Sequence, residues 1–185
     1  MQINIKPASY REVDGDLILF AKEGEFEVIA HGCNCFCKMK RGLAYQMDKE
    51  FDCNSPQVYM KEHPRTEGDV TKLGTIEGNY AAPIISCKSN GGFLKVVNMY
   101  TQYHYSDKGK PFDYEAFTSC LRHLNTDYAG KTIGLPRIGT GLAGAEWEIV
   151  REIIKEELKD CYVTIVTFKD EDDEDDLYYR HGYFI

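Results

Sequence analysis

Two stretches of the sequence combine residue types that could bind a phosphate-bearing ligand. The first joins an apolar segment to a helical pattern and holds His31, Asn34 and Gly42. In open α/β sheets, ligands bind beyond the carboxyl ends of the strands, where His31 and Asn34 are expected. Gly42, at the expected start of the helix, would let a ligand approach backbone N–H groups that attract anions. The pattern predicts a binding site in this loop.

The second stretch is rich in glycine. Gly139, Gly141 and Gly144 again lie between an apolar segment and a helical pattern. Glycines at these spacings free the backbone to wrap phosphate oxygens with N–H groups, and Thr140 could add a hydroxyl donor. The spacing matches GxGxxG, but its place late in the chain leaves the fingerprint of a dinucleotide fold incomplete. A tight turn that serves only packing is the alternative interpretation.

Other candidate residues have equally simple alternatives. His31 could be an ordinary buried or exposed histidine. Asp16 could accept a hydrogen bond from an exocyclic amine, or it could serve a turn around Gly15. The tyrosine-rich stretch 100–105 (YTQYHY) could stack on a base or a ribose, or it could be the end of an ordinary strand.

Seven cysteines at positions 33, 35, 37, 53, 87, 120 and 161 predict reduced thiols rather than a disulfide framework. The Cys33-x-Cys35-x-Cys37 run lacks the second cysteine pair of a zinc site, so we expect no metal. The thiols could pack as small hydrophobic side chains. A nucleophilic cysteine would need a neighbour such as Lys38 to stabilise its thiolate, and that alternative stays open.

The net charge of −8 is concentrated in one segment. Seven consecutive acids occupy positions 170–176, and removing them from the 30 acidic residues leaves 23 against 22 basic ones. Such runs are typically solvated, so we expect residues 169–185 to form an acidic and aromatic tail. The nearly neutral remainder argues against extended nucleic-acid binding. Without a membrane-spanning run or signal peptide, we expect a cytoplasmic protein, in the host cytoplasm if it is viral.

Short β-like runs alternate with helical patterns along residues 1–168, which we expect to form a single domain. The clearest helical spacing is that of Trp147, Val150 and Ile154. Alternating strands and helices predict a sheet between two helical layers. The expected strands are 3–8, 27–31, 72–77, 94–99, 132–135 and 161–168, and the expected helices are 43–51, 56–62, 113–124 and 145–158.

Taken together, these motifs resemble the macro domain family. The family's strand that ends in asparagine is similar to residues 28–34 (VIAHGCN), and its diphosphate loop is similar to residues 139–147 (GTGLAGAEW). Residues 97–103 (VNMYTQY) resemble bacterial and bacteriophage members. The likeness covers roughly residues 10–168 and implies a three-layer α/β/α sandwich with a mixed central sheet.

The resemblance also implies that the ligand is ADP-ribose or a derivative of it. It places Asp16 at the adenine amine, Leu17 in the adenine pocket and Phe168 near adenine, while Asn34 would meet the distal ribose. The backbone that would pass close to the ligand belongs to Gly42, Leu43 and Ala44 in the first stretch and to Gly139, Thr140, Gly141, Leu142 and Ala143 in the second.

Within the family, the first motif resembles that of the ADP-ribose-1″-phosphate phosphatases, in which a histidine at the position of His31 is implicated in catalysis. We therefore expect phosphate removal from ADP-ribose 1″-phosphate. In this hypothesis His31 activates water or attacks phosphorus, and Asn34 positions the ribose. Lys40 and Arg41 would stabilise the departing phosphate. No metal or cofactor is required.

Departures from the family pattern keep two alternatives open. Terminal ADP-ribose protein glycohydrolases need a lysine where this chain has Met99 or Tyr100, and an aspartate where it has Ala143. The phosphatases also use that aspartate. One alternative is a non-catalytic reader of ADP-ribose, free or protein-linked. The other is hydrolysis of ADP-ribosylated protein or nucleic acid, or of O-acetyl-ADP-ribose. We expect a monomer whose partners are this ligand and, for a reader, ADP-ribosylated protein.

Overall fold

The computed structural model describes residues 9–54, 67–89, 91–105, 111–141 and 143–168. The expected strand 3–8, the expected helix 56–62 and the tail 169–185 lie outside these residues. No helix in the described part of the chain is long and apolar enough to cross a membrane.

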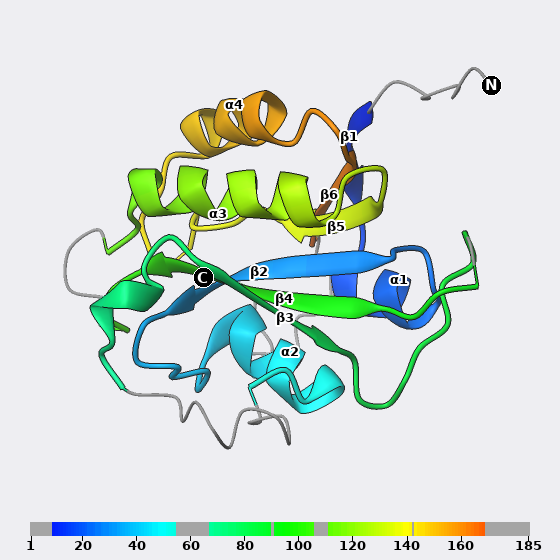
Figure 1. Cartoon of the computed structure of the whole chain (residues 1–185), viewed down its shortest axis with the longest axis horizontal. Coiled ribbons are helices and arrows are strands. Elements are labelled where there is room, and N and C mark those ends of the chain that lie inside the picture. Colours follow the sequence, from blue (N-terminus) through cyan, green and yellow to red (C-terminus); the bar gives the residue numbers. More distant parts are fainter. Residues whose placement is uncertain (1–8, 55–66, 90, 106–110, 142, 169–185) are drawn as a thin grey trace, which may run out of the picture.

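A single mixed sheet organises the fold (Figure 1). Its strand order is β1-β6-β5-β2-β4-β3, with every neighbouring pair parallel except β3 and β4. The strands are β1 (Ser9–Asp14), β2 (Val28–Asn34), β3 (Ile76–Tyr80), β4 (Lys95–Gln102), β5 (Thr132–Pro136) and β6 (Tyr162–Thr167). The helices are α1 (Leu17–Lys22), α2 (Gly42–Phe51), α3 (Tyr114–Asp127), α4 (Trp147–Glu157) and the short 3-10 helix η2 (Val70–Lys72). This arrangement is the predicted α/β/α sandwich with a mixed central sheet.

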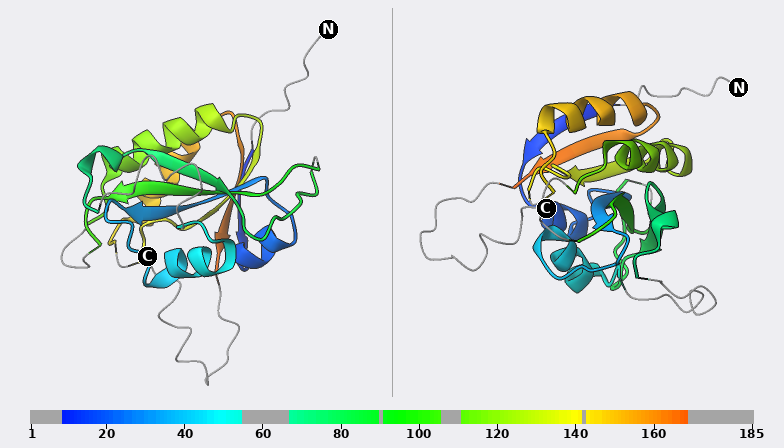
Figure 2. Two further views of the ribbon diagram at one scale, coloured as in Figure 1. Left: turned by 60° about the horizontal axis from the view of Figure 1, so that its bottom comes forward. Right: turned by 90° about the vertical axis from the view of Figure 1, so that its left-hand side faces the viewer.

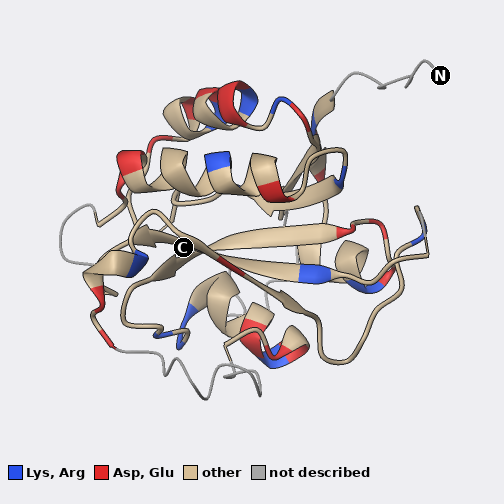
Figure 3. Ribbon diagram, in the orientation of Figure 1, with Lys and Arg blue, Asp and Glu red and all other residues tan. Residues whose placement is uncertain are grey.

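Helices cover both faces of the sheet, with α1 and α2 on one side and α3 and α4 on the other (Figures 1 and 2). Alternation along β2 separates the two cores: Ile29 and Cys33 pack with the first helix pair, whereas Val28 and Ala30 pack with the second. Because strand side chains alternate between faces, a central strand buried on both sides is mostly apolar, and His31 and Asn34 are the polar residues of β2. Acidic and basic residues are interspersed on the outer helices (Figure 3).

The two long helices on the second face form where the apolar spacing predicts them. In α3 the carboxylate of Asp113 caps the helix by accepting a hydrogen bond from the N–H of Ala116 at 2.9 Å. In α4 the fully buried Val150 and Ile154 face the sheet. Burial of such a stripe, more than intrinsic helix propensity, stabilises helices of this length.

Three elements differ from the sequence predictions. The strand β1 and the helix α1 were not predicted, since α1 has only six residues and β1 carries four exposed or charged positions among six. The predicted strand 72–77 begins later, at Ile76, and its first residues form η2. Gly74 explains the shift: its φ of 79° interrupts an extended backbone, and its N–H donates to the carbonyl of Tyr100 at 2.9 Å.

Candidate ligand-binding site

Parallel strands bring the candidate residues to one edge of the sheet. The strands β1, β6, β5, β2 and β4 are consecutive neighbours and run in the same direction. The loops that follow them therefore leave the sheet at the same, carboxyl edge. This edge carries Asp16 after β1, Phe168 after β6, residues 137–146 between β5 and α4, and residues 35–41 between β2 and α2.

The β5–α4 loop (residues 137–146) is shaped by its glycines. Gly139 has a φ of 77°, and a Cβ there would lie 2.5 Å from the ring of Phe112, so only glycine fits. The N–H of Ala145 closes a turn on the carbonyl of Gly139 at 2.7 Å. The Thr140 hydroxyl donates to the carbonyl of Arg137 at 2.9 Å, which orients it within the loop.

The same loop presents several backbone donors without an acceptor. Within the described residues, the N–H groups of Gly139, Thr140, Gly141 and Ala143 make no hydrogen bond. Gly139 and Ala143 are nonetheless buried residues. Since buried N–H groups are almost always paired, a set of unpaired ones in one loop indicates a place for an external acceptor. Leu142, predicted to belong to this loop's ligand contacts, lies outside the described residues.

A second set of unpaired donors lies at the start of α2. Gly42, with a φ of 63°, is the first helical residue, and no side chain caps this helix end. The N–H groups of Gly42, Leu43 and Ala44 make no hydrogen bond within the described part of the chain, as expected for a first helical turn. Lys40 and Arg41, just before this turn, are exposed. Their cationic side chains and the helix N-terminus together favour an anion.

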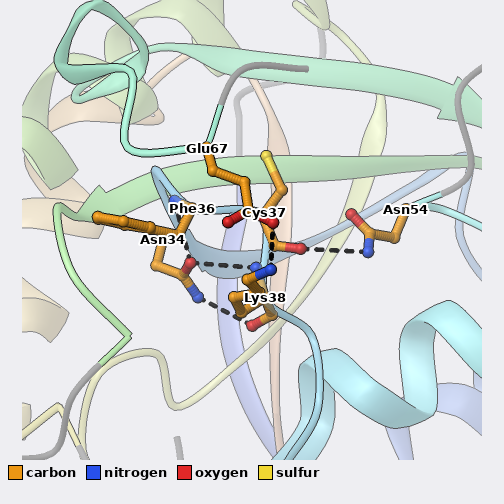
Figure 4. A network of polar contacts seen from close by, with 6 residues as sticks. All are labelled: Asn34, Phe36, Cys37, Lys38, Asn54 and Glu67. Atoms are coloured by element: carbon orange, nitrogen blue, oxygen red, sulfur yellow. Dashed lines mark hydrogen bonds and ion pairs between the residues drawn. The ribbon is translucent and has the colours of Figure 1, made fainter. Parts of the chain in front are cut away.

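Asn34 organises the β2–α2 loop (residues 35–41) from within (Figure 4). Its Oδ1 accepts hydrogen bonds from the N–H of Phe36 at 3.2 Å and of Lys38 at 3.1 Å. Its Nδ2 donates to the carbonyl of Lys38 at 2.9 Å. Lys38 in turn forms an ion pair with Glu67, and Asn54 donates to the carbonyl of Cys37 at 3.3 Å. The contact of Asn34 with a ribose stays a prediction, while its role in shaping the loop is visible.

His31 lies inside the sheet and has no exposed surface. Its Nε2 lies 2.8 Å from Oδ1 of Asn98, whose Nδ2 donates to the carbonyl of Cys53 at 2.9 Å. An Oδ1 atom can only accept, so Nε2 carries the hydrogen. Burial lowers the pKa of His31 to about 4, although the bond to Asn98 opposes the shift, so the ring is neutral at pH 7. The predicted catalytic role stays a prediction, and the observed contacts favour a structural one.

The cysteines are buried for the most part, and Cys37 is the one of intermediate exposure. Burial raises the pKa of the Cys35 thiol to about 11, which disfavours the thiolate that a nucleophile requires. Cys33 and Cys53 lie against the ring of His31, with sulfur-to-nitrogen distances of 3.7–3.9 Å. No group of three or more potential metal ligands occurs among the described residues.

Asp16 and Phe168 lie at the same corner of the carboxyl edge. The N–H of Gly15 donates to the carbonyl of Thr167 at 2.9 Å, which joins the end of β1 to the end of β6. Asp16 caps α1, since its Oδ1 accepts from the N–H of Ile18 at 2.7 Å and of Leu19 at 3.1 Å. Phe168 is partly exposed, whereas Leu17 is buried in the first core. The contacts of Asp16, Leu17 and Phe168 with adenine remain predictions.

Sequence reasoning missed the residues that support the site from other elements. Phe112 packs against Gly139, and its N–H donates to the carbonyl of Ala143 at 3.3 Å. The Tyr114 hydroxyl accepts from the N–H of Glu146 at 2.8 Å and holds the start of α4. Asn98 fixes His31. These partners are 27 or more residues away along the chain, and no local pattern marks such pairs.

The fold of the chain is that of solved macrodomains. The macrodomain of Thermus aquaticus DarG is 21% identical and superimposes with a TM-score of 0.61, covering 88% of this chain and 99% of that one. Thermosipho africanus DarTG in complex with ADP-ribose is 18% identical, with a TM-score of 0.64 over 93% of this chain and 46% of that one. No family model matches the sequence.

An uncharacterized 17.5 kDa protein of enterobacteria phage T4, encoded in the tk-vs intergenic region, is 35% identical over 147 residues. The match covers 77% of this chain and 85% of the phage protein. The chain belongs to the family of this phage protein.

Proposed function

We propose that the protein binds ADP-ribose, or a derivative substituted on its distal ribose, at the carboxyl edge of the sheet. The observation that carries this proposal is two sets of N–H groups that make no hydrogen bond among the described residues, one in the β5–α4 loop and one in the first turn of α2. The strands β5 and β2 that lead into them are hydrogen-bonded neighbours. Two adjacent anion-binding loops suit a diphosphate better than a single phosphate.

In this proposal the rest of the ligand extends to both sides of the diphosphate. Adenine lies toward Asp16 and Phe168, beyond β6, and the distal ribose lies toward Asn34, at the end of β2. The ADP-ribose complex of Thermosipho DarTG, a protein of which 46% superimposes on this chain, supports the choice of ligand. Lys40 and Arg41, exposed beside Gly42, are suited to an anionic group on the distal ribose.

We favour a binding module over a hydrolase. The His31 ring is fully buried, which disfavours its direct contact with a substrate phosphorus. Ala143 contributes a buried methyl group where the related hydrolases have a carboxylate. Recognition of ADP-ribose on a modified protein is compatible with both observations.

The test is calorimetric titration of the full chain with ADP-ribose, ADP, AMP and ATP. ADP-ribose is expected to bind with micromolar affinity, and AMP at least roughly tenfold more weakly than ADP, because AMP lacks one of the two phosphates. ADP-ribose is also expected to raise the melting temperature, since it binds only the folded chain. A larger thermal shift with ATP than with ADP-ribose would contradict the proposal.

The second candidate is phosphate removal from ADP-ribose 1″-phosphate. The exposed Lys40 and Arg41 favour it, because they could bind and neutralise a terminal phosphate. Phosphate release should then fall in the double variant Lys40→Gln, Arg41→Gln and persist in Lys49→Gln, an exposed lysine in the last turn of α2. Full activity of His31→Ala would rule out the histidine mechanism, and absence of any phosphate release would leave the binding function alone.

A further inference from the structure

Four aromatic side chains gather at the surface beside the proposed distal-ribose end. Phe36 comes from the β2–α2 loop, whereas Tyr103, His104 and Tyr105 follow β4; we refer to these four residues as the aromatic cluster. The ring of Phe36 meets the other three edge to face, with centroids 4.8–5.5 Å apart. His104 and Tyr105 stack at 4.3 Å. The two loops are joined directly, since the N–H of Cys35 donates to the carbonyl of Tyr103 at 3.1 Å.

The cluster is held firmly although it is exposed. Tyr103 and Tyr105 remain 42% and 46% exposed. The Tyr103 hydroxyl nevertheless donates to the carbonyl of Gly68 at 3.0 Å. A Cβ at Gly68 would lie 2.9 Å from the Phe36 ring, so the backbone there packs directly against the aromatic face. An exposed apolar surface with fixed geometry is typical of a binding site.

A carboxylate next to the cluster favours a cation. Gly68, which contacts Phe36, stands between two acidic residues, Glu67 and Asp69. Hydrogen bonds from the Thr71 hydroxyl and N–H lower the pKa of Asp69, which keeps this carboxylate ionised. Glu67 pairs with Lys38 and neutralises that ammonium group. Aromatic faces attract planar and quaternary cations, and the ionised Asp69 adds to that attraction.

The position of the cluster relates it to the ligand. Phe36 donates its N–H to Oδ1 of Asn34, the residue that faces the distal ribose in the proposed function. The carbon that carries a hydroxyl in ADP-ribose, C1 of the distal ribose, carries a planar pyridinium ring in NAD⁺. We propose that the aromatic cluster receives this nicotinamide ring, so that the site binds intact NAD⁺. This inference rests on the proposed ADP-ribose site.

Calorimetric affinities for NAD⁺, NADH and ADP-ribose test the inference on the full chain. NADH is the matched control, because its nicotinamide ring is neutral and no longer aromatic. NAD⁺ is expected to bind roughly fivefold more tightly than NADH, the size of one partly exposed cation–π contact. Equal affinities for the two dinucleotides would overturn the inference.

Two variants test whether the cluster causes this preference, and a third variant serves as a control. Tyr105→Leu and Phe36→Leu should each remove the preference for NAD⁺ over NADH while leaving ADP-ribose affinity within about twofold. Leucine retains the apolar packing in both. Tyr80→Leu, at a comparably exposed tyrosine in β3, should change nothing. Binding of ADP-ribose with exclusion of NAD⁺ would refute only this inference, whereas failure to bind either ligand would refute the proposed function as well.

Discussion

The two loops that flank the proposed diphosphate position are ordered by different means. In the β2–α2 loop, the single side chain of Asn34 takes up two backbone N–H groups and one carbonyl. In the β5–α4 loop, backbone turns at Gly139 and Gly141 accept the N–H groups of Ala145 and Gly144. The first device pairs the N–H groups of Phe36 and Lys38, whereas the second leaves four N–H groups of its loop without an acceptor among the described residues. The β5–α4 loop can therefore bind an anion through its own N–H groups, whereas the β2–α2 loop leads to the first turn of α2, whose N–H groups can do so.

This difference also assigns different sensitivities to mutation. A loop built on one side chain depends on the identity of that side chain, here Asn34. A loop built on left-handed backbone depends on the absence of a Cβ, here at Gly139, whose φ is 77°. The expected consequences therefore differ in size.

Substitution of Gly139 by alanine should produce the largest effect. The new Cβ would lie 2.5 Å from Phe112 and 2.9 Å from Ala145, at a left-handed φ. Overpacking and backbone strain together should lower the free energy of unfolding by about 4 kcal/mol. Urea unfolding measures the loss, and ADP-ribose binding should disappear at ligand concentrations that saturate the unchanged protein.

Gly130→Ala provides the matched control. Gly130 also has a left-handed φ, 76°, but a Cβ there would contact nothing within 4 Å. Its cost should be only about 1 kcal/mol, the strain of the backbone alone. Equal losses in the two variants would show that close packing at Gly139 does not shape the loop.

Acid should have the second largest effect, because it lowers the free energy of unfolding through protonation of His31. The folded protein keeps His31 neutral down to about pH 4, whereas the unfolded chain protonates it near the ordinary value of 6.5. The unfolded state therefore binds more protons between these values, and the free energy of unfolding falls as the pH drops through this window. The expected total is ~3 kcal/mol. Urea unfolding at pH 7, 6, 5 and 4 measures it.

His31→Gln tests the assignment of this pH dependence. Glutamine keeps an amide donor for Asn98 but does not titrate, so the slope between pH 6.5 and 4 should flatten. Hydrogen exchange should show the loss of protection in residues 33–38 before residues 139–145. A slope unchanged in the variant would assign the acid effect to other groups.

Much of the fold could be predicted from the sequence because its longer elements carry strong local patterns. The stripe in α4 and the β-branched run in β6 each follow from the periodicity of burial. The helix α1 was not predicted because six residues are too few to show a helical periodicity of apolar positions. Asp16 is also as typical of a turn as of a helix cap.

The site was predictable at its backbone and less so at its side chains. The spacing of Gly139, Gly141 and Gly144 indicates a loop with N–H groups available to a ligand, and Gly42 indicates a helix N-terminus without a side-chain cap. The sequence predicts these two features because each depends on local backbone conformation. Whether a polar side chain faces a ligand or its own protein depends on distant partners. His31 is bonded to Asn98, 67 residues away, and a sequence pattern contains no record of that contact.

Asn34→Ala should have an intermediate effect, confined to the β2–α2 loop. It removes the acceptor for two N–H groups and the donor to Lys38, which should cost about 2 kcal/mol. Asn34→Asp keeps the acceptor and should recover at least half of that stability. If Asn34 also contacts the ribose through Nδ2, the affinity of Asn34→Asp for ADP-ribose should stay low even where its stability recovers, because aspartate lacks this donor. Full recovery of both stability and affinity would limit Asn34 to a structural role.

Thr140→Val should have the smallest effect, and it separates hydroxyl from backbone in the glycine loop. The Thr140 hydroxyl already donates to the carbonyl of Arg137, so it is not available to a phosphate in this arrangement. If the unpaired N–H groups bind the diphosphate, valine should lower ADP-ribose affinity by less than about threefold and stability by about 0.5 kcal/mol. A loss of tenfold or more in calorimetry would mean that the hydroxyl turns to the ligand, and that the second loop, like the first, depends on one side chain.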